Sequence, residues 1–146
     1  MMISTRTRYG TRALVELACA YPERAVSVKE IAESQKISPK YLEQILAPVK
    51  ASGIIRSVRG MHGGYALAKP PDEVQVMQVF RVLEGCPILL ECVETEGVCA
   101  SEATCPTRDL WMDIKNAVEG ILQKTTLQDL VHRKKQKAQK GVTYEI

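Results

Sequence analysis

The stretch SVKEIAESQKISPKYLEQILAPVKASG, residues 27–53, predicts two short helices joined by a tight turn. Ser27 and Glu30 form a capping box, in which the serine hydroxyl accepts from the Glu30 N–H and the Glu30 carboxylate returns to the Ser27 N–H. The first helix should therefore cover residues 28–35. Its apolar side chains fall on one face, and we expect them to be buried: Val28, Ile31 and Ala32.

The second helix is expected over residues 39–51, because Ser38 is a favourable N-cap and Pro39 a favourable first helical residue. Residues 52–53 should end it, and Pro48 should bend it by removing one backbone hydrogen bond. The buried stripe is Leu42, Ile45, Leu46 and Val49. The exposed groups around its first turn are Ser38, Lys40, Tyr41, Glu43 and Gln44. Such groups can hold phosphates or read base edges, so the pair indicates a helix-turn-helix, although other helical hairpins of this length look alike.

A β-hairpin is predicted directly after the second helix. Residues 54–58 and 65–68 are short strand candidates, and the loop between them contains three glycines. Glycine lets the tip adopt positive φ and approach a partner closely. The hairpin carries three side chains suited to DNA: Arg56, Arg59 and His62. A slender arginine-bearing tip fits a minor groove, so the hairpin is interpreted as the wing of a winged helix, and metal binding by His62 is the less favoured alternative.

Two flanking helices complete a mainly α-helical domain over residues 1–84. Residues 9–20 form an amphipathic pattern that buries Leu14, Leu17 and Ala18, and Cys19 within it reads as a small core side chain. A helix is also expected over residues 74–84, with these side chains in the core: Val76, Val79, Phe80 and Leu83.

Charge is unevenly distributed along the 146 residues. Residues 1–70 hold eleven Lys and Arg against five Asp and Glu, residues 71–131 hold four against eleven, and residues 132–146 hold five against one. The basic first half suits double-stranded DNA, and a solvated basic surface is the plainer alternative. No run of signal-peptide or membrane-span length occurs, so no membrane partner is expected and the predicted location is the cytoplasm.

Residues 92–105, CVETEGVCASEATC, place three cysteines in a polar segment without apolar periodicity. Such a segment cannot form a core, and thiolates are ligands for iron–sulfur clusters or zinc. The five cysteines are an odd number and the expected compartment is reducing, which disfavours a disulfide framework. We predict a metal centre held by Cys92, Cys99 and Cys105.

A long helix is predicted from Pro106 to about Lys124. Its apolar stripe consists of Leu110, Trp111, Ile114, Val118, Ile121 and Leu122. We interpret this stripe as a homodimer contact, with packing against the chain's own winged domain as the alternative. Thr126 and Asp129 form a second capping box, and the basic tail, residues 132–146, is expected to be flexible or helical only at its start.

Together these motifs resemble the IscR/NsrR/RirA-type family of winged-helix transcription regulators over nearly the whole chain. The motifs are Arg8-Tyr9-Gly10, SVKEIA (27–32), SPKYLEQ (38–44), SVRGMHGGYAL (57–67), the three-cysteine loop and CPTRDLW (105–111). The resemblance implies a homodimer with crossing long helices and a cluster, bound by three cysteines per protomer, that changes operator affinity. It places DNA-reading positions on Ser38, Lys40, Tyr41, Glu43, Gln44 and Arg59.

The fourth ligand of that cluster departs from the family. Where family members can use a histidine three residues after the last cysteine, this chain has Arg108, and an aspartate that others supply from the first helix is absent near Thr7 and Arg8. Cys86 is the leading candidate, a buried thiol at a turn being the alternative; a nearby glutamate or a small thiol also stays open. Either a [2Fe–2S] or a [4Fe–4S] cluster would fit all-cysteine ligation.

The prediction is therefore a homodimeric DNA-binding regulator that senses cluster, iron or redox status, with a cysteine-bearing loop over residues 85–105 and a dimerisation element over residues 106–131. The alternative is a regulator of the same fold with zinc or no metal in the loop, responding to thiol oxidation or a partner protein. No nucleophile–base constellation or phosphate loop is found, so an enzyme is not expected.

Overall fold

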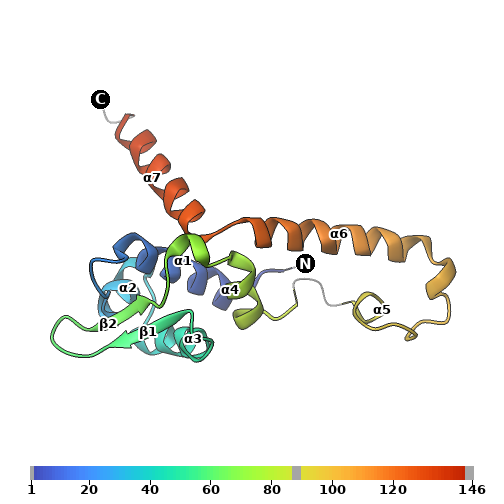
Figure 1. Ribbon diagram of the computed structural model, residues 1–146, viewed down its shortest axis with the longest axis horizontal. Coiled ribbons are helices and arrows are strands. Elements are labelled where there is room, and N and C mark those ends of the chain that lie inside the picture. Colours follow the sequence, from blue (N-terminus) through green and yellow to red (C-terminus); the bar gives the residue numbers. More distant parts are fainter. Residues whose placement is uncertain (1, 87–89, 144–146) are drawn as a thin grey trace.

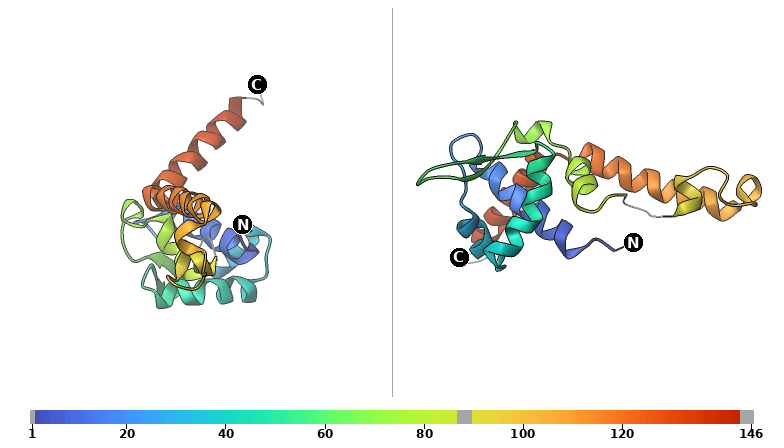
Figure 2. Two further views of the ribbon diagram at one scale, coloured as in Figure 1. Left: turned by 90° about the vertical axis from the view of Figure 1, so that its right-hand side faces the viewer. Right: turned by 90° about the horizontal axis from the view of Figure 1, so that it is seen from below.

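The computed structural model describes residues 2–86 and 90–143, except for the side chains of residues 142 and 143. The described chain is mainly helical, with one two-stranded antiparallel sheet (Figures 1 and 2). The elements in order are α1 (Thr5–Ala20), α2 (Val28–Gln35), α3 (Pro39–Ala51), β1 (Ile55–Val58), β2 (Gly64–Leu67), the 3-10 turn η1 (Pro71–Glu73), α4 (Val76–Leu83), α5 (Glu91–Glu94), the 3-10 turn η2 (Glu102–Thr104), α6 (Pro106–Lys124) and α7 (Leu127–Thr143). This confirms the predicted fold class.

The helix-turn-helix forms from local capping. Ser27 and Ser38 are the N-caps of α2 and α3, each accepting from a backbone N–H at 3.1 Å. The turn between the helices is made by Lys36, whose φ is +57°, and the next N–H, of Ile37, donates to the Ala32 carbonyl at 3.0 Å. These bonds satisfy groups that a helix end would otherwise leave unpaired.

One half of the predicted capping box is wrong. The Glu30 carboxylate pairs with the Arg24 guanidinium at 2.7 and 3.0 Å instead of returning to Ser27. Hydrogen bonding to Arg24 lowers the pKa of Glu30. The charged partner offers a carboxylate a stronger bond than the neutral N–H does.

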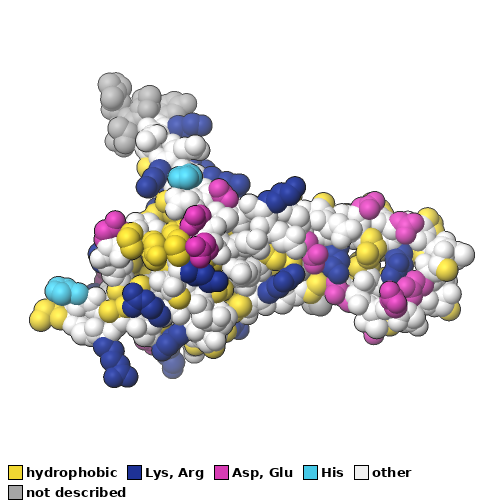
Figure 3. Space-filling view, viewed as in Figure 1, with side chains coloured by type: hydrophobic (Ala, Val, Ile, Leu, Met, Phe, Trp, Pro, Cys, Tyr) yellow, Lys and Arg dark blue, Asp and Glu magenta, His cyan; other side chains and the backbone are white. Residues whose placement is uncertain are grey.

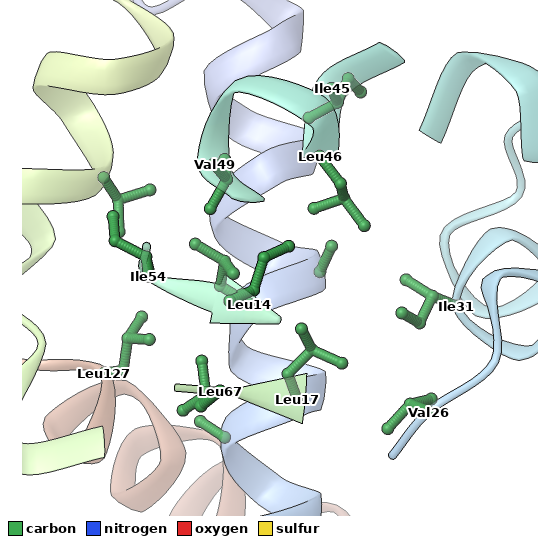
Figure 4. Packing of buried hydrophobic residues seen from close by; sticks show 14 of the residues in the cluster. Leu14, Leu17, Val26, Ile31, Ile45, Leu46, Val49, Ile54, Leu67 and Leu127 are labelled. Atoms are coloured by element: carbon green, nitrogen blue, oxygen red, sulfur yellow. The ribbon is translucent and has the colours of Figure 1, made fainter. Parts of the chain in front are cut away.

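A single apolar core joins the helices and the sheet (Figure 4). Leu14 and Leu17 of α1 lie at its centre, facing Ile31 of α2, Leu46 of α3 and Leu67 of β2. Each such side chain contributes about 1.5–3 kcal/mol by leaving water. The stripes predicted for α1, α3 and α4 are all buried.

The sheet pairs Ile55 with Leu67 and Val58 with Gly64. It is held to the body by Val26, whose N–H and carbonyl both bond to the Tyr65 backbone at 2.9 Å. This close approach depends on Gly64, which has φ of +148° and where an added Cβ would lie 2.1 Å from the Val26 oxygen. The wing, residues 55–67, therefore has a fixed base.

Helix α6 projects from this body as the main part of an arm, residues 90–124 (Figures 1 and 2). None of its described side chains is buried. At its base, the Val76 N–H donates to the Thr125 carbonyl at 2.8 Å and the Leu127 N–H donates to the Val74 carbonyl at 2.9 Å. Leu127 and Val131 then anchor the start of α7 in the core.

Further sequence expectations also need correction. Cys19 is exposed on α1 rather than buried, because it lies outside the stripe formed by Leu14, Leu17 and Ala18. Val28 is half-buried. The basic tail continues α7 as a helix to Thr143 instead of stopping near its start. In the part of the chain that is described, no helix is long and apolar enough to cross a membrane.

Candidate nucleic-acid interface and cysteine segment

Helix α3 presents a polar surface around its N-terminus. Four of the five side chains predicted there are exposed: Ser38, Lys40, Glu43 and Gln44. Ser38 also accepts from the Tyr41 N–H at 3.1 Å, so its oxygen caps the helix while its hydroxyl proton can still be donated. The apolar stripe of the same helix lies in the core, which leaves the polar face accessible.

Tyr41 differs from the other four because it is half-buried. Its ring meets the Tyr9 ring edge to face, with centroids 6.4 Å apart and an interplanar angle of 82°. The Arg12 guanidinium in turn lies 5.8 Å from the centroid of Tyr9. The sequence showed Tyr9 only as part of a family motif and did not predict its contact with Tyr41, because that contact joins α1 to a helix some thirty residues later in the chain.

The wing places its predicted DNA-contacting side chains outside the body. Arg56, Arg59 and His62 are all exposed, and Met61 at the tip is 94% exposed. Figure 3 shows Lys and Arg side chains along the lower edge of the body, below the wing and α3. A cationic edge next to a polar helix face is suited to a phosphate backbone.

The cysteine segment, residues 85–105, links α4 to α6. Cys86 is half-buried, and its Sγ donates to Glu94 Oε1 at 3.0 Å. Cys92 is half-buried in α5, Cys99 is exposed before η2, and Cys105 is half-buried immediately before α6. No disulfide joins any of the chain's five cysteines.

Two charged side chains of α6 hold this segment. Lys115 Nζ lies 2.8 Å from Glu94 Oε1, and this contact lowers the pKa of Glu94 and raises that of Lys115. Arg108 donates from Nε to the Cys92 carbonyl at 2.9 Å and pairs with Glu102 at 3.0 Å. The residue that replaces the expected histidine ligand therefore acts as a bridge between α5, η2 and α6.

The Cys105 thiol lies beside a hydroxyl group. Its Sγ lies 3.2 Å from Thr107 Oγ1. The Thr107 hydroxyl, followed by the Arg108 backbone N–H, lowers the pKa of the Cys105 thiol. A thiolate at this position is favoured both as a nucleophile and as a metal ligand.

The predicted ligands do not converge. Among the described residues, no three Cys, His, Asp or Glu side chains are arranged to hold one metal ion. The thiols of Cys86 and Cys105 bond to Glu94 and Thr107 instead. The arrangement of the donors in this structure thus does not fit a bound cluster, although the donor types would suit one.

Comparison with known proteins identifies the family. The model described as Rrf2, an iron-dependent transcriptional regulator, matches residues 3–133. The chain belongs to the Rrf2 family of transcriptional regulators. Among curated Rrf2-type relatives, it is 39% identical to the HTH-type transcriptional regulator CymR of Bacillus subtilis over 130 residues, covering 89% of each chain. It is 33% identical to the regulator IscR of Serratia proteamaculans over 132 residues, covering 90% of this chain and 80% of that relative.

Solved structures agree with this Rrf2 assignment. CymR, described as the global cysteine regulator of B. subtilis, superposes with a TM-score of 0.77 at 36% identity, covering 91% of this chain and 98% of that one. IscR of T. potens gives a TM-score of 0.74 at 34% identity, covering 91% and 88%. The chain is thus a transcriptional regulator, as predicted, rather than an enzyme.

Proposed function

We propose that this Rrf2 regulator binds operator DNA as a homodimer and that the cysteine segment controls its affinity. The observation that carries the proposal is the shared edge of α3 and the wing. Exposed Lys40, Glu43 and Gln44 lie on the helix, and exposed Arg56 and Arg59 lie on the hairpin. Helix residues would read base edges in the major groove while the wing arginines contact the backbone or the minor groove.

Dimerisation is proposed from the arm. Its helix is 19 residues long and buries none of its described side chains, yet one stripe is apolar. The exposed fractions are 50% for Leu110, 39% for Trp111, 40% for Ile114 and 67% for Ile121. These four side chains do not pack against the chain's own body, so contact with a second copy of the chain is favoured over that alternative.

The dimer can be tested with the chain's single tryptophan. Dilution should separate the protomers and shift the Trp111 emission to longer wavelength, in parallel with the mass measured by sedimentation. Leu110→Glu should give a monomer that keeps its helical circular dichroism. Val98→Glu is a control, since it adds the same charge to an exposed apolar residue outside the stripe. A Leu110→Glu chain that stays dimeric would exclude this interface.

For the input, we propose an iron–sulfur cluster held by Cys92, Cys99 and Cys105, with Cys86 as the candidate fourth ligand. Its support is the cysteine-rich composition of the segment and the family model, whose description is iron-dependent. Because the thiols do not converge here, the segment has to close before three of them can share one group. The contacts of Arg108 and Lys115 connect any such movement to α6.

A second input is favoured by a separate observation. The lowered pKa of the Cys105 thiol raises its reactivity towards oxidants. CymR, similar to this chain along nearly its whole length, is described as a cysteine regulator. Thiol oxidation, or zinc in place of iron, is therefore the competing proposal for the same segment.

One preparation distinguishes these inputs. Protein purified without oxygen should contain iron and sulfide and absorb visible light, and Cys92→Ser should abolish both. Cys19→Ser is the matched control, since Cys19 is exposed on α1 and outside the segment. Stoichiometric zinc without iron, or a reversible disulfide in colourless protein, would support the second input and refute the first. Operator affinity measured on the same samples tests whether the segment controls binding.

A further inference from the structure

Glu84, the residue directly before the cysteine segment, is bonded to the first turn of α1. Its Oε2 accepts from the Ser4 N–H at 3.1 Å, from the Ser4 hydroxyl at 2.7 Å and from the Thr7 hydroxyl. Glu84 is the C-cap of α4 and Ser4 is the N-cap of α1. One carboxylate oxygen therefore joins the end of one helix to the start of another.

These bonds have little competition from water on the α1 side. Thr7 is 2% exposed. Hydrogen bonds to an ionised acceptor are about twice as strong as neutral ones. The Ser4 hydroxyl also donates to Thr7 Oγ1 at 3.1 Å. Removing the Glu84 carboxylate would leave the two hydroxyls only each other and would remove the bonds that specify the position of α1 relative to the end of α4.

The next turn of α1 contacts α3, which is the recognition helix of the helix-turn-helix. Tyr9 packs against Tyr41. Gly10 is so tightly enclosed that an added Cβ would lie 2.4 Å from Leu83 Cδ1 and 3.1 Å from Ile45 Cγ2. This turn is thus held between α4 on one side and α3 on the other. A close-packed contact transmits a displacement because it has no space to absorb it.

We infer that Ser4, Thr7 and Glu84, here called the Glu84 clasp, position the recognition helix according to the state of the cysteine segment. Cys86 is only two residues beyond Glu84, so a movement at the start of the segment displaces the carboxylate. The clasp passes that displacement to α1, and the contacts of Tyr9 and Gly10 pass it to α3. The regulatory part of this inference rests on the proposed function. Glu84 and Thr7 are positioning residues that act through α1.

The first test is a double-mutant cycle on operator affinity, using the full chain. The cysteine state is changed by replacing Cys92, Cys99 and Cys105 with Ser. In the native background this should change the dissociation constant by at least about fivefold. In Thr7→Val and Glu84→Leu the same replacement should change it less than about twofold. Thr7→Ser and Glu84→Gln keep a donor and an acceptor, and should restore the native response. A full native response in Thr7→Val and Glu84→Leu would overturn the inference.

The second test does not depend on the state of the cysteine segment. Amide hydrogen exchange of DNA-free protein should become faster in the first turn of α3 for Thr7→Val and Glu84→Leu, with α2 as internal reference. Thr11→Val is the matched control, because the Thr11 hydroxyl bonds only within α1, to the Thr7 carbonyl. Unchanged exchange in α3 would refute the mechanical link. If the triple cysteine replacement leaves the operator affinity of the native chain unchanged, the proposal that the cysteine segment controls affinity is refuted. The hydrogen-exchange result still tests whether the Glu84 clasp positions α3.

Discussion

Replacing Gly64 with alanine should detach the wing from its base. The new Cβ would lie 2.1 Å from the Val26 oxygen, 2.5 Å from the Val26 carbonyl carbon and 2.7 Å from Ser27 Cα. All three are backbone atoms at the entrance of α2, so no side-chain rotation relieves the clash. The backbone bonds between Val26 and Tyr65 must therefore open.

The cost has two parts. Holding alanine at a φ of +148° costs about 1–3 kcal/mol. Losing two backbone hydrogen bonds costs about 0.5–1.5 kcal/mol each. The sum, about 2–6 kcal/mol, is a large part of the roughly 5–15 kcal/mol that stabilises a typical domain. Urea unfolding should show a midpoint lowered by about 1 M or more.

Gly60→Ala separates the two parts, because Gly60 also has positive φ, +110°, but has no atom near the added Cβ. It should carry only the conformational cost and unfold at a midpoint between those of the native chain and Gly64→Ala. Operator affinity should fall further in Gly64→Ala than in Gly60→Ala. Equal midpoints for the two variants would refute the argument from close approach.

Three further outcomes follow from the same structure. Arg59→Ala should lower operator affinity and reduce the slope of log affinity against log salt by about one, whereas Lys124→Ala at the end of α6 should leave the slope unchanged. Hydrogen bonds from the Thr126 N–H and hydroxyl lower the pKa of Asp129, so the ionised carboxylate stabilises α7 above about pH 4, and this stabilisation is lost as the pH falls through the lowered pKa. Helical circular dichroism should show the loss, and Asp129→Asn should remove its pH dependence. Gly10→Ala should cost about 1–3 kcal/mol through overpacking against Leu83, offset by the roughly 1 kcal/mol that alanine gains over glycine inside a helix. A urea midpoint raised by that full gain would contradict the packing.

The sequence by itself determined the helix-turn-helix and most helix ends. Ser38 and Pro39 start α3, and Pro106 starts α6, at the residues predicted. Capping bonds join residues three or four positions apart, so their partners can be recognised in the chain itself. The apolar stripes were predictable for the same reason, because a helix repeats every 3.6 residues whatever it packs against. The length of α7 was underestimated because its charge suggested a flexible tail, although Lys, Gln and Ala all favour helix.

Only the tertiary structure decided which distant groups meet. Glu84 bonds to Ser4 and Thr7, near the other end of the winged domain, and no spacing rule relates these positions. The role of Arg108 as a bridge to Cys92 and Glu102 depends on how α5 folds back on α6. The cysteines could be identified in the sequence, but their positions depend on the packing of the arm. Which residues far apart in the chain come into contact depends on the packing of the whole fold, and the local sequence pattern does not predict it.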